Sequence, residues 1–253
     1  MLRRSLAVAA IDARILRRDP APILVMIVIP LLFVPFLLPG ASAQLAATGH
    51  AGASGAQYAV PGLAVLFAML CVQQIVVAFH RDMQSGTWER LRISPAGLPS
   101  LLAGKALAAF VAQLLQLGVV LGGGVVLFGY RPAGSWMGIA VVGFAFSLVM
   151  VAFGVLVVGA FATQDQALAV CSIVAMLMAG LGGAFGPVAA LPEALRAVAP
   201  VSPAFWALDA LSALSLDGAG LHDILASVAV LFAFAGAFAV GAVVAFSRRG
   251  RWS

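Results

Sequence analysis

Residues 137–161 read MGIAVVGFAFSLVMVAFGVLVVGAF, and this stretch contains no charged side chain. As an α-helix it is long enough to cross the roughly 30 Å hydrocarbon layer of a membrane. Five further apolar runs lie near 22–38, 58–79, 106–128, 167–186 and 223–246. The sequence therefore predicts an all-α polytopic membrane protein with six transmembrane helices, in a single domain over residues 1–253.

The composition agrees with this fold class. Of the 253 residues, 63% are hydrophobic and 9% are charged, whereas a soluble domain has about 45–50% apolar and about 25% charged residues. A water-soluble enzyme, a disordered chain and a nucleic-acid-binding domain are therefore excluded. The two cysteines, Cys71 and Cys171, fall inside apolar runs and are interpreted as small buried hydrophobic residues.

The basic residues predict the orientation of the chain. The segments 1–21, 80–105 and 247–253 hold 12 of the 14 Lys and Arg residues, while Arg131 and Arg196 are on the other side. Because basic residues flank spans on the cytoplasmic side, both termini and the 80–105 loop are expected in the cytoplasm. The expected location is the bacterial inner (plasma) membrane, with segments 39–57, 129–136 and 187–222 facing outward.

The N-terminal segment 1–21 is predicted to form an amphipathic helix at the inner membrane surface, because its apolar residues and its arginines occupy neighbouring arcs. The apolar run that follows contains Pro30 and Pro35, so it is expected to be kinked or short. This run with Ala41-Ser42-Ala43 imitates a cleaved signal peptide, but its roughly 17 residues exceed the usual 7–15. We therefore expect a retained span.

The outer segment 187–222 is long and still apolar. Within it, residues 204–214 (AFWALDALSAL) predict a short helix that cannot span the membrane and is re-entrant or interfacial. Its large apolar side chains are expected to meet lipid; they are Phe205, Trp206, Leu208 and Leu211.

Polar residues inside the runs allow two interpretations each. Gln113 and Gln116 share one helical face, where they can bond to a neighbouring helix or line a transport pathway. Gly118-x3-Gly122 and Gly182-x3-Gly186 permit close helix approach, either within one subunit or between subunits.

Two short stretches resemble motifs that are typical of enzymes. Gly52-Ala53-Ser54-Gly55 matches the serine motif of rhomboid-type intramembrane proteases, and such a nucleophile needs a base within hydrogen-bond reach. The hypothesis of an intramembrane serine protease using Ser54 is therefore kept as an alternative from a different class. The three scattered histidines predict no metal site, and Gly97…Gly104-Lys105 fails the phosphate-binding loop pattern.

The last five runs contain no charged residue in their interiors. Proton- or ion-driven carriers normally keep ionisable groups at membrane depth. If this chain moves a solute, its free energy is therefore expected from a partner, and the long cytoplasmic loop is the place where a partner can act.

That loop carries a family pattern: Gly86-Thr87-x-Glu89-Arg90-Leu91, then Ser94-Pro95, then Leu101-Leu102-x-Gly104-Lys105. Arg18-Asp19-Pro20 before the first span and residues 200–206 before the last one fall in the same order. The chain thus resembles the permeases of type-2 ATP-binding-cassette (ABC) exporters, of the drug-efflux or polysaccharide-export kind. Asp82 departs from the pattern, since members often have Glu there.

The resemblance implies a working unit of two permease subunits, taken as identical, and two copies of a separate ABC ATPase. ATP and magnesium would be bound by the ATPase, and this chain would bind no cofactor. A coupling helix near 82–94 would dock on the ATPase, with Trp88 and Leu91 as anchors. The residues expected at this contact are Asp82, Gly86, Thr87, Trp88, Glu89, Arg90, Leu91 and Arg92.

The expected function is export of a hydrophobic or amphiphilic compound, since the spans offer an apolar pathway. A drug-like compound is the leading hypothesis, and a lipid-linked glycan is the alternative within this class. The expected contacts are the ATPase, a second permease and membrane lipids, and not nucleic acid.

Overall fold

The computed structural model describes residues 14, 18, 20–50, 52–84 and 97–249, and helices dominate these ranges. Six helices are long and apolar enough to cross a membrane. They are α2 (Ala21–Ala47), α3 (Ala56–Gln84), α5 (Gly97–Phe128), α6 (Trp136–Ala160), α7 (Gln164–Gly182) and α10 (Leu225–Arg249). The prediction of an all-α protein with six membrane-length helices is thus confirmed, while the N-terminal segment predicted to be amphipathic lies almost wholly outside the described residues.

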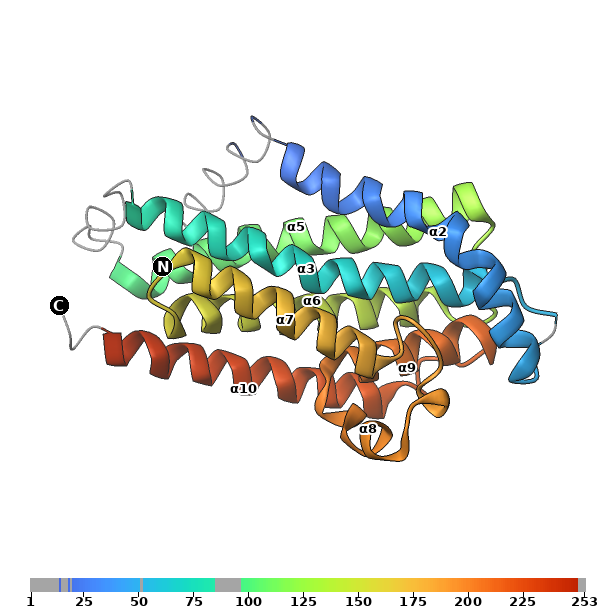
Figure 1. Ribbon diagram of the computed structural model, residues 1–253. Coiled ribbons are helices and arrows are strands. Elements are labelled where there is room, and N and C mark those ends of the chain that lie inside the picture. Colours follow the sequence, from blue (N-terminus) through green and yellow to red (C-terminus); the bar gives the residue numbers. More distant parts are fainter. Residues whose placement is uncertain (1–13, 15–17, 19, 51, 85–96, 250–253) are drawn as a thin grey trace.

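Successive membrane-length helices run in opposite directions, so the bundle has two distinct ends (Figure 1). We call the end where α3 and α10 finish and α5 begins the basic end, since it carries Arg81, Lys105 and Arg248. The opposite end, which we call the far end, holds the α2–α3 connection and the four short elements between α7 and α10. These are a 3-10 turn at Val188–Ala190, α8 (Glu193–Val198), a second 3-10 turn at Ala199–Val201, and α9 (Pro203–Leu216).

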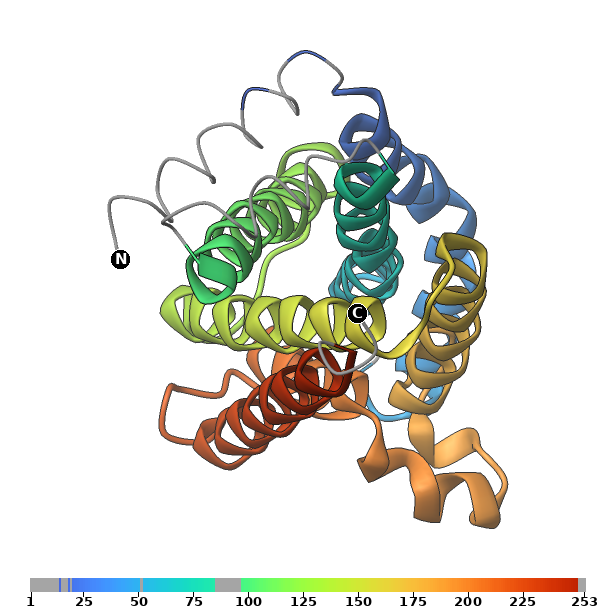
Figure 2. The ribbon, with the colours of Figure 1, turned by 90° about the vertical axis from the view of Figure 1, so that its left-hand side faces the viewer.

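Two helices form the centre of the bundle. In α3 and in α6, 67% of the most apolar window is buried, whereas the other four spans have 17–33% buried. Figure 2 shows α2, α5, α7 and α10 placed around α3 and α6. The outer helices expose large apolar side chains such as Leu32, Val126 and Val243, which is the distribution expected of a bundle surrounded by lipid.

Hydroxyl side chains cap the N-termini of several of these helices. Ser135 accepts a hydrogen bond from the Gly138 N–H at the start of α6, and Ser202 accepts one from the Ala204 N–H at the start of α9. Such caps satisfy N–H groups that have no partner inside the helix. At the other end of α7, Gly183 adopts a left-handed conformation with φ of 94°, which a glycine takes without steric cost.

The first span is longer than the sequence predicts. Helix α2 continues through Pro30, Pro35 and Pro39 to Ala47, so the predicted end at residue 38 was wrong. Each proline removes one backbone donor, but neighbouring helices make such interruptions tolerable in membrane helices. Figure 1 shows that the helix changes direction along its length.

The environment of α9 also differs from its prediction. Leu208 and Leu211 are buried, because α9 packs against α3, α6, α7 and α10, so the expectation that these two leucines face lipid was wrong. The chain bends by 94° between residues 193–201 and α9. The re-entrant placement of this segment in a membrane stays a prediction.

The glycine pairs fall into two classes. A Cβ on Gly182 would lie 2.8 Å from the Ala204 backbone, so this glycine allows α7 to approach α9 closely within one subunit. A Cβ on Gly118 or on Gly122 would meet no atom within 4 Å. Among the described residues, Gly118 and Gly122 are therefore not needed for close helix approach.

Candidate functional site

The candidate site lies at the basic end, where α3 and α5 flank the connection expected to dock on a partner. Helix α3 ends at Gln84 and α5 begins at Gly97. Of the residues predicted for coupling, Asp82 lies in α3. The remaining seven, Gly86, Thr87, Trp88, Glu89, Arg90, Leu91 and Arg92, lie outside the described residues, so their docking role stays a prediction.

Asp82 is paired within the chain. Its Oδ2 lies 2.5 Å from Nζ of Lys105, and the two side chains are 15% and 2% exposed. The ammonium group also lies 5.2 Å from the ring centroid of Phe79, a buried residue one turn earlier in α3. The lysine is thus held by a carboxylate and by an aromatic face.

Burial makes the two charges dependent on one another. An ion taken out of water is costly unless a partner compensates it, and removing one partner leaves the other uncompensated. Lys105 and Asp82 therefore tie the last turn of α3 to the first turns of α5. A displacement of the connection between them would be transmitted to both helices together.

A hollow of about 540 Å³ lies at the same end of the bundle, between the end of α3 and the α6–α7 turn. It is lined by His80, Met83 and residues 162–165. The His80 Nδ1–H donates to the Val76 carbonyl at 2.9 Å, and its Nε2 has no hydrogen-bond partner among the described residues. The basic end thus combines a braced helix pair with a concave surface.

The two predicted glutamines are buried in the bundle. Gln113 donates to the Ala68 carbonyl of α3 at 2.6 Å, and Gln116 donates to the Met26 carbonyl of α2 at 3.4 Å. The carbonyl oxygen Oε1 of Gln116 has no partner among the described residues. Both side chains therefore join α5 to its neighbours in this conformation, and a role in lining a pathway stays a prediction.

The serine considered for catalysis has a local role. Ser54 accepts a hydrogen bond from the Ala56 N–H at 3.3 Å at the start of α3. The nearest histidine in the sequence, His50, has its Nε2 at 3.0 Å from Asp217. The described contacts therefore do not join Ser54 to His50 as a nucleophile to its base.

Sequence reasoning did not find the pairing of Asp82 with Lys105. In the sequence, Lys105 is only one of the basic residues that predict the orientation in the membrane and a part of the family pattern. A signal was present, because the two residues carry opposite charges at the ends of adjacent apolar runs. Their positions along the chain did not predict that the two side chains would pair and be largely shielded from solvent.

The fold defines a multi-pass membrane protein in which an ion pair joins the central helix α3 to the outer helix α5 at one end of the bundle. The family model described as ABC-2 family transporter protein matches residues 42–244, and the chain belongs to this family. The resemblance to type-2 ABC permeases is thus confirmed, and the chain is a transporter membrane subunit.

A curated relative gives a more specific likeness. The linearmycin resistance permease protein LnrN of Bacillus subtilis is 26% identical to this chain over 208 residues. The aligned part covers 81% of this chain and 54% of the relative. The chain therefore spans about half the length of this relative.

Proposed function

We propose that the chain is the permease subunit of an ATP-driven exporter that moves a hydrophobic or amphiphilic, drug-like compound out of the cytoplasm. Membership of the ABC-2 transporter family supports this function, and so does the likeness to a permease named for resistance to linearmycin. The spans supply an apolar path, and their interiors after the first run contain no charged residue for proton coupling.

The proposed working unit contains two copies of this permease and two copies of a separate ABC ATPase, in the bacterial inner membrane. ATP and magnesium are bound by the ATPase, and both permease termini face the cytoplasm. The concentration of basic residues at one end of the bundle supports this orientation.

The observation that carries the proposed coupling is the buried pair of Asp82 and Lys105. It fixes the helix ends on both sides of the connection expected to dock on the ATPase, so that the helices follow the connection when it moves. Gln113 and Gln116 are retained as candidates for pathway lining, which requires the α5 face to separate from α2 and α3 during transport.

The test uses membrane vesicles that contain the permease with its ATPase and measures ATP-dependent transport of ethidium, a fluorescent amphiphilic cation. The double variant Glu89→Ala, Arg90→Ala should reduce transport and ATPase stimulation at least about tenfold, because interface charge pairs fix the register of docking. The matched control is Glu193→Ala, Arg196→Ala, which removes the same two charges from α8 at the far end and should change neither quantity.

Two results would contradict the proposal. Unchanged transport in the Glu89, Arg90 double variant would remove the docking role of the connection. Transport by vesicles that contain this chain alone, without any nucleotide hydrolase, would remove the dependence on an ATPase.

A further inference from the structure

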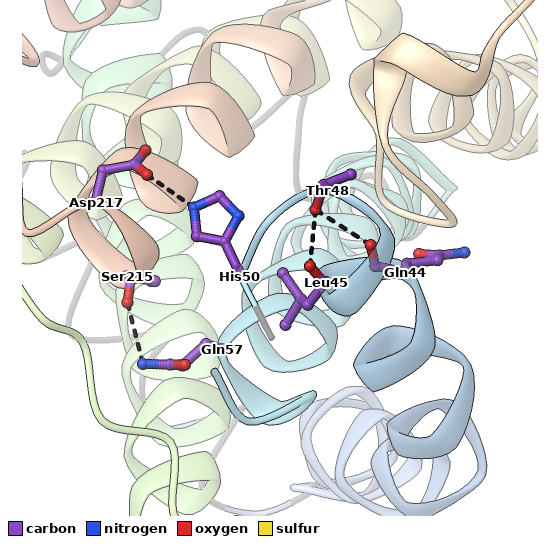
Figure 3. Close-up of polar contacts among 7 residues, drawn as sticks. All are labelled: Gln44, Leu45, Thr48, His50, Gln57, Ser215 and Asp217. Atoms are coloured by element: carbon purple, nitrogen blue, oxygen red, sulfur yellow. Dashed lines mark hydrogen bonds and ion pairs between the residues drawn. The ribbon is translucent and has the colours of Figure 1, made fainter. Parts of the chain in front are cut away.

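A cavity of about 310 Å³ opens at the far end among α9, the end of α7, the start of α3 and the α2–α3 connection. Part of its wall is apolar, formed by Leu45, Pro61, Val188, Phe205, Leu208 and Leu216. Figure 3 shows the polar contacts that hold the α2–α3 connection beside the end of α9. The volume and the apolar wall suit a small amphiphile.

The charged part of the wall is acidic. Asp209 and Asp217 both line the cavity, and no Lys or Arg is found among the described residues of its lining. Asp217 Oδ1 lies 3.0 Å from His50 Nε2, and Asp209 Oδ2 accepts a hydrogen bond from the Ser227 hydroxyl at 3.0 Å. Because a carboxylate can accept about four hydrogen bonds, each retains capacity for a further donor.

The histidine adds a third acceptor. If the His50 Nε2–H donates to Asp217, the other ring nitrogen, Nδ1, is left as an acceptor. This atom is shielded from solvent and has no hydrogen-bond partner among the described residues. The polar groups of the cavity thus favour a ligand that is positively charged and carries N–H donors.

We propose that this cavity binds an amphiphile carrying a protonated amine, with the ammonium group at the acidic part of the wall that Asp209 and Asp217 supply and the apolar body against the wall formed by α9 and α3. The assignment of the cavity as a site on the exit side of transport rests on the proposed function. Binding itself does not, because the cavity lies within one permease subunit. The same ammonium chemistry is offered by a free amphiphile and by the headgroup of phosphatidylethanolamine.

The experiment measures equilibrium binding to the full chain in phosphatidylcholine nanodiscs without ATPase, with empty discs subtracted. The probes are propranolol, an aromatic amine that is cationic at neutral pH, and N-acetylpropranolol, its uncharged amide. Asp209→Asn and Asp217→Asn should each weaken propranolol binding about tenfold, as expected for loss of a charge-assisted hydrogen bond. Neither variant should change binding of the amide.

Asp223→Asn is the matched control, because Asp223 lies at the same end but accepts a hydrogen bond from the Gly220 N–H and does not line the cavity. Asp209→Glu keeps the charge and should keep binding. Asparagine can still accept the Ser227 hydrogen bond, so Asp209→Asn changes the charge with little change of the wall. Thermal unfolding of each variant confirms that it is folded.

Equal affinity for propranolol and its amide would overturn the proposal, and so would Asp209 and Asp217 variants that bind propranolol like Asp223→Asn. Competition by phosphatidylethanolamine in the discs would identify the lipid headgroup as the ammonium source, and absence of competition would identify the free amphiphile. ATP-dependent ethidium transport is measured separately. Intact transport with failed propranolol binding therefore overturns the cavity and leaves the exporter standing.

Discussion

Asp82 and Lys105 meet out of solvent at the basic end, whereas His50 and Asp217 meet in solvent at the far end. The first pair has side chains 15% and 2% exposed, and the second has side chains 35% and 61% exposed. Low solvent exposure makes the first pair hard to break, because water can replace the lost contact of Lys105 only poorly. The second pair can exchange its partners with water or a ligand at low cost.

This difference suits the two tasks proposed for the ends. The basic end is expected to receive a displacement from another subunit, so its two helices need to move together. The far end is expected to bind and release a ligand, so its polar groups need to remain available. Five substitutions test whether the two ends differ in this way.

The largest effect is expected for Lys105→Met, which removes the ion pair with Asp82 and the contact of the ammonium group with the Phe79 ring. We expect a loss of about 3 kcal/mol in the free energy of unfolding, measured by thermal or denaturant unfolding in nanodiscs. Arg81→Met, which removes an exposed charge from the adjacent position in α3, should have little effect. Equal stability of the two variants would show that the buried pair does not brace the basic end.

The next effect is expected for Gly182→Ala at the far end. The added Cβ would lie 2.8 Å from Ala204 Cβ and from the Phe205 nitrogen, so α7 and α9 must separate. Overpacking of this kind costs about 1–3 kcal/mol. Gly118→Ala is the control, because its Cβ meets no atom within 4 Å and alanine favours the helix. A melting temperature unchanged by Gly182→Ala would mean that the far end yields more readily than the structure indicates.

A smaller effect is expected between the two ends, where the glutamines join α5 to its neighbours. Gln113→Leu removes a hydrogen bond of 2.6 Å and should cost about 0.6–1.7 kcal/mol. Gln116→Leu removes a bond of 3.4 Å together with an unpaired buried carbonyl oxygen, so it should be neutral or stabilising. The unfolding free energies of the two variants should therefore differ in this order, and the reverse order would contradict the bonding described.

The smallest effect on stability is expected for Asp217→Asn. The pair with His50 is largely exposed, and exposed pairs contribute about 0–1 kcal/mol. Unfolding should therefore be nearly unchanged, although ligand binding at the cavity should weaken. A destabilisation as large as that of Lys105→Met would abolish the distinction between the ends.

Hydropathy alone was sufficient to predict the six spans, because membrane length and the absence of charges are properties of the local sequence. It was insufficient for α2 and α9. Pro30 and Pro35 led to the expectation of a kinked or short span, but the helix continues past both to Ala47. Leu208 and Leu211 look suited to lipid, but their surroundings depend on helices up to about 150 residues away in the chain.

The candidate site was predictable to a similar degree. The family pattern in the 80–105 loop directed attention to the basic end of the bundle. It could not show that Asp82 and Lys105 pair, since burial of both side chains depends on how α3 and α5 pack. The acidic cavity was also not predictable, because residues 50, 209 and 217 come to line one cavity only through the fold.

The burial of α9 has a consequence for protein engineering. Because this short helix contacts α3, α6, α7 and α10, segment 187–222 cannot be exchanged between related permeases as an independent loop. A chimera that receives this segment from a relative should assemble only when the contacting surfaces of those four spans are transferred with it. Attempts to alter cargo preference by loop grafting should therefore transfer the segment together with the helix surfaces that contact it.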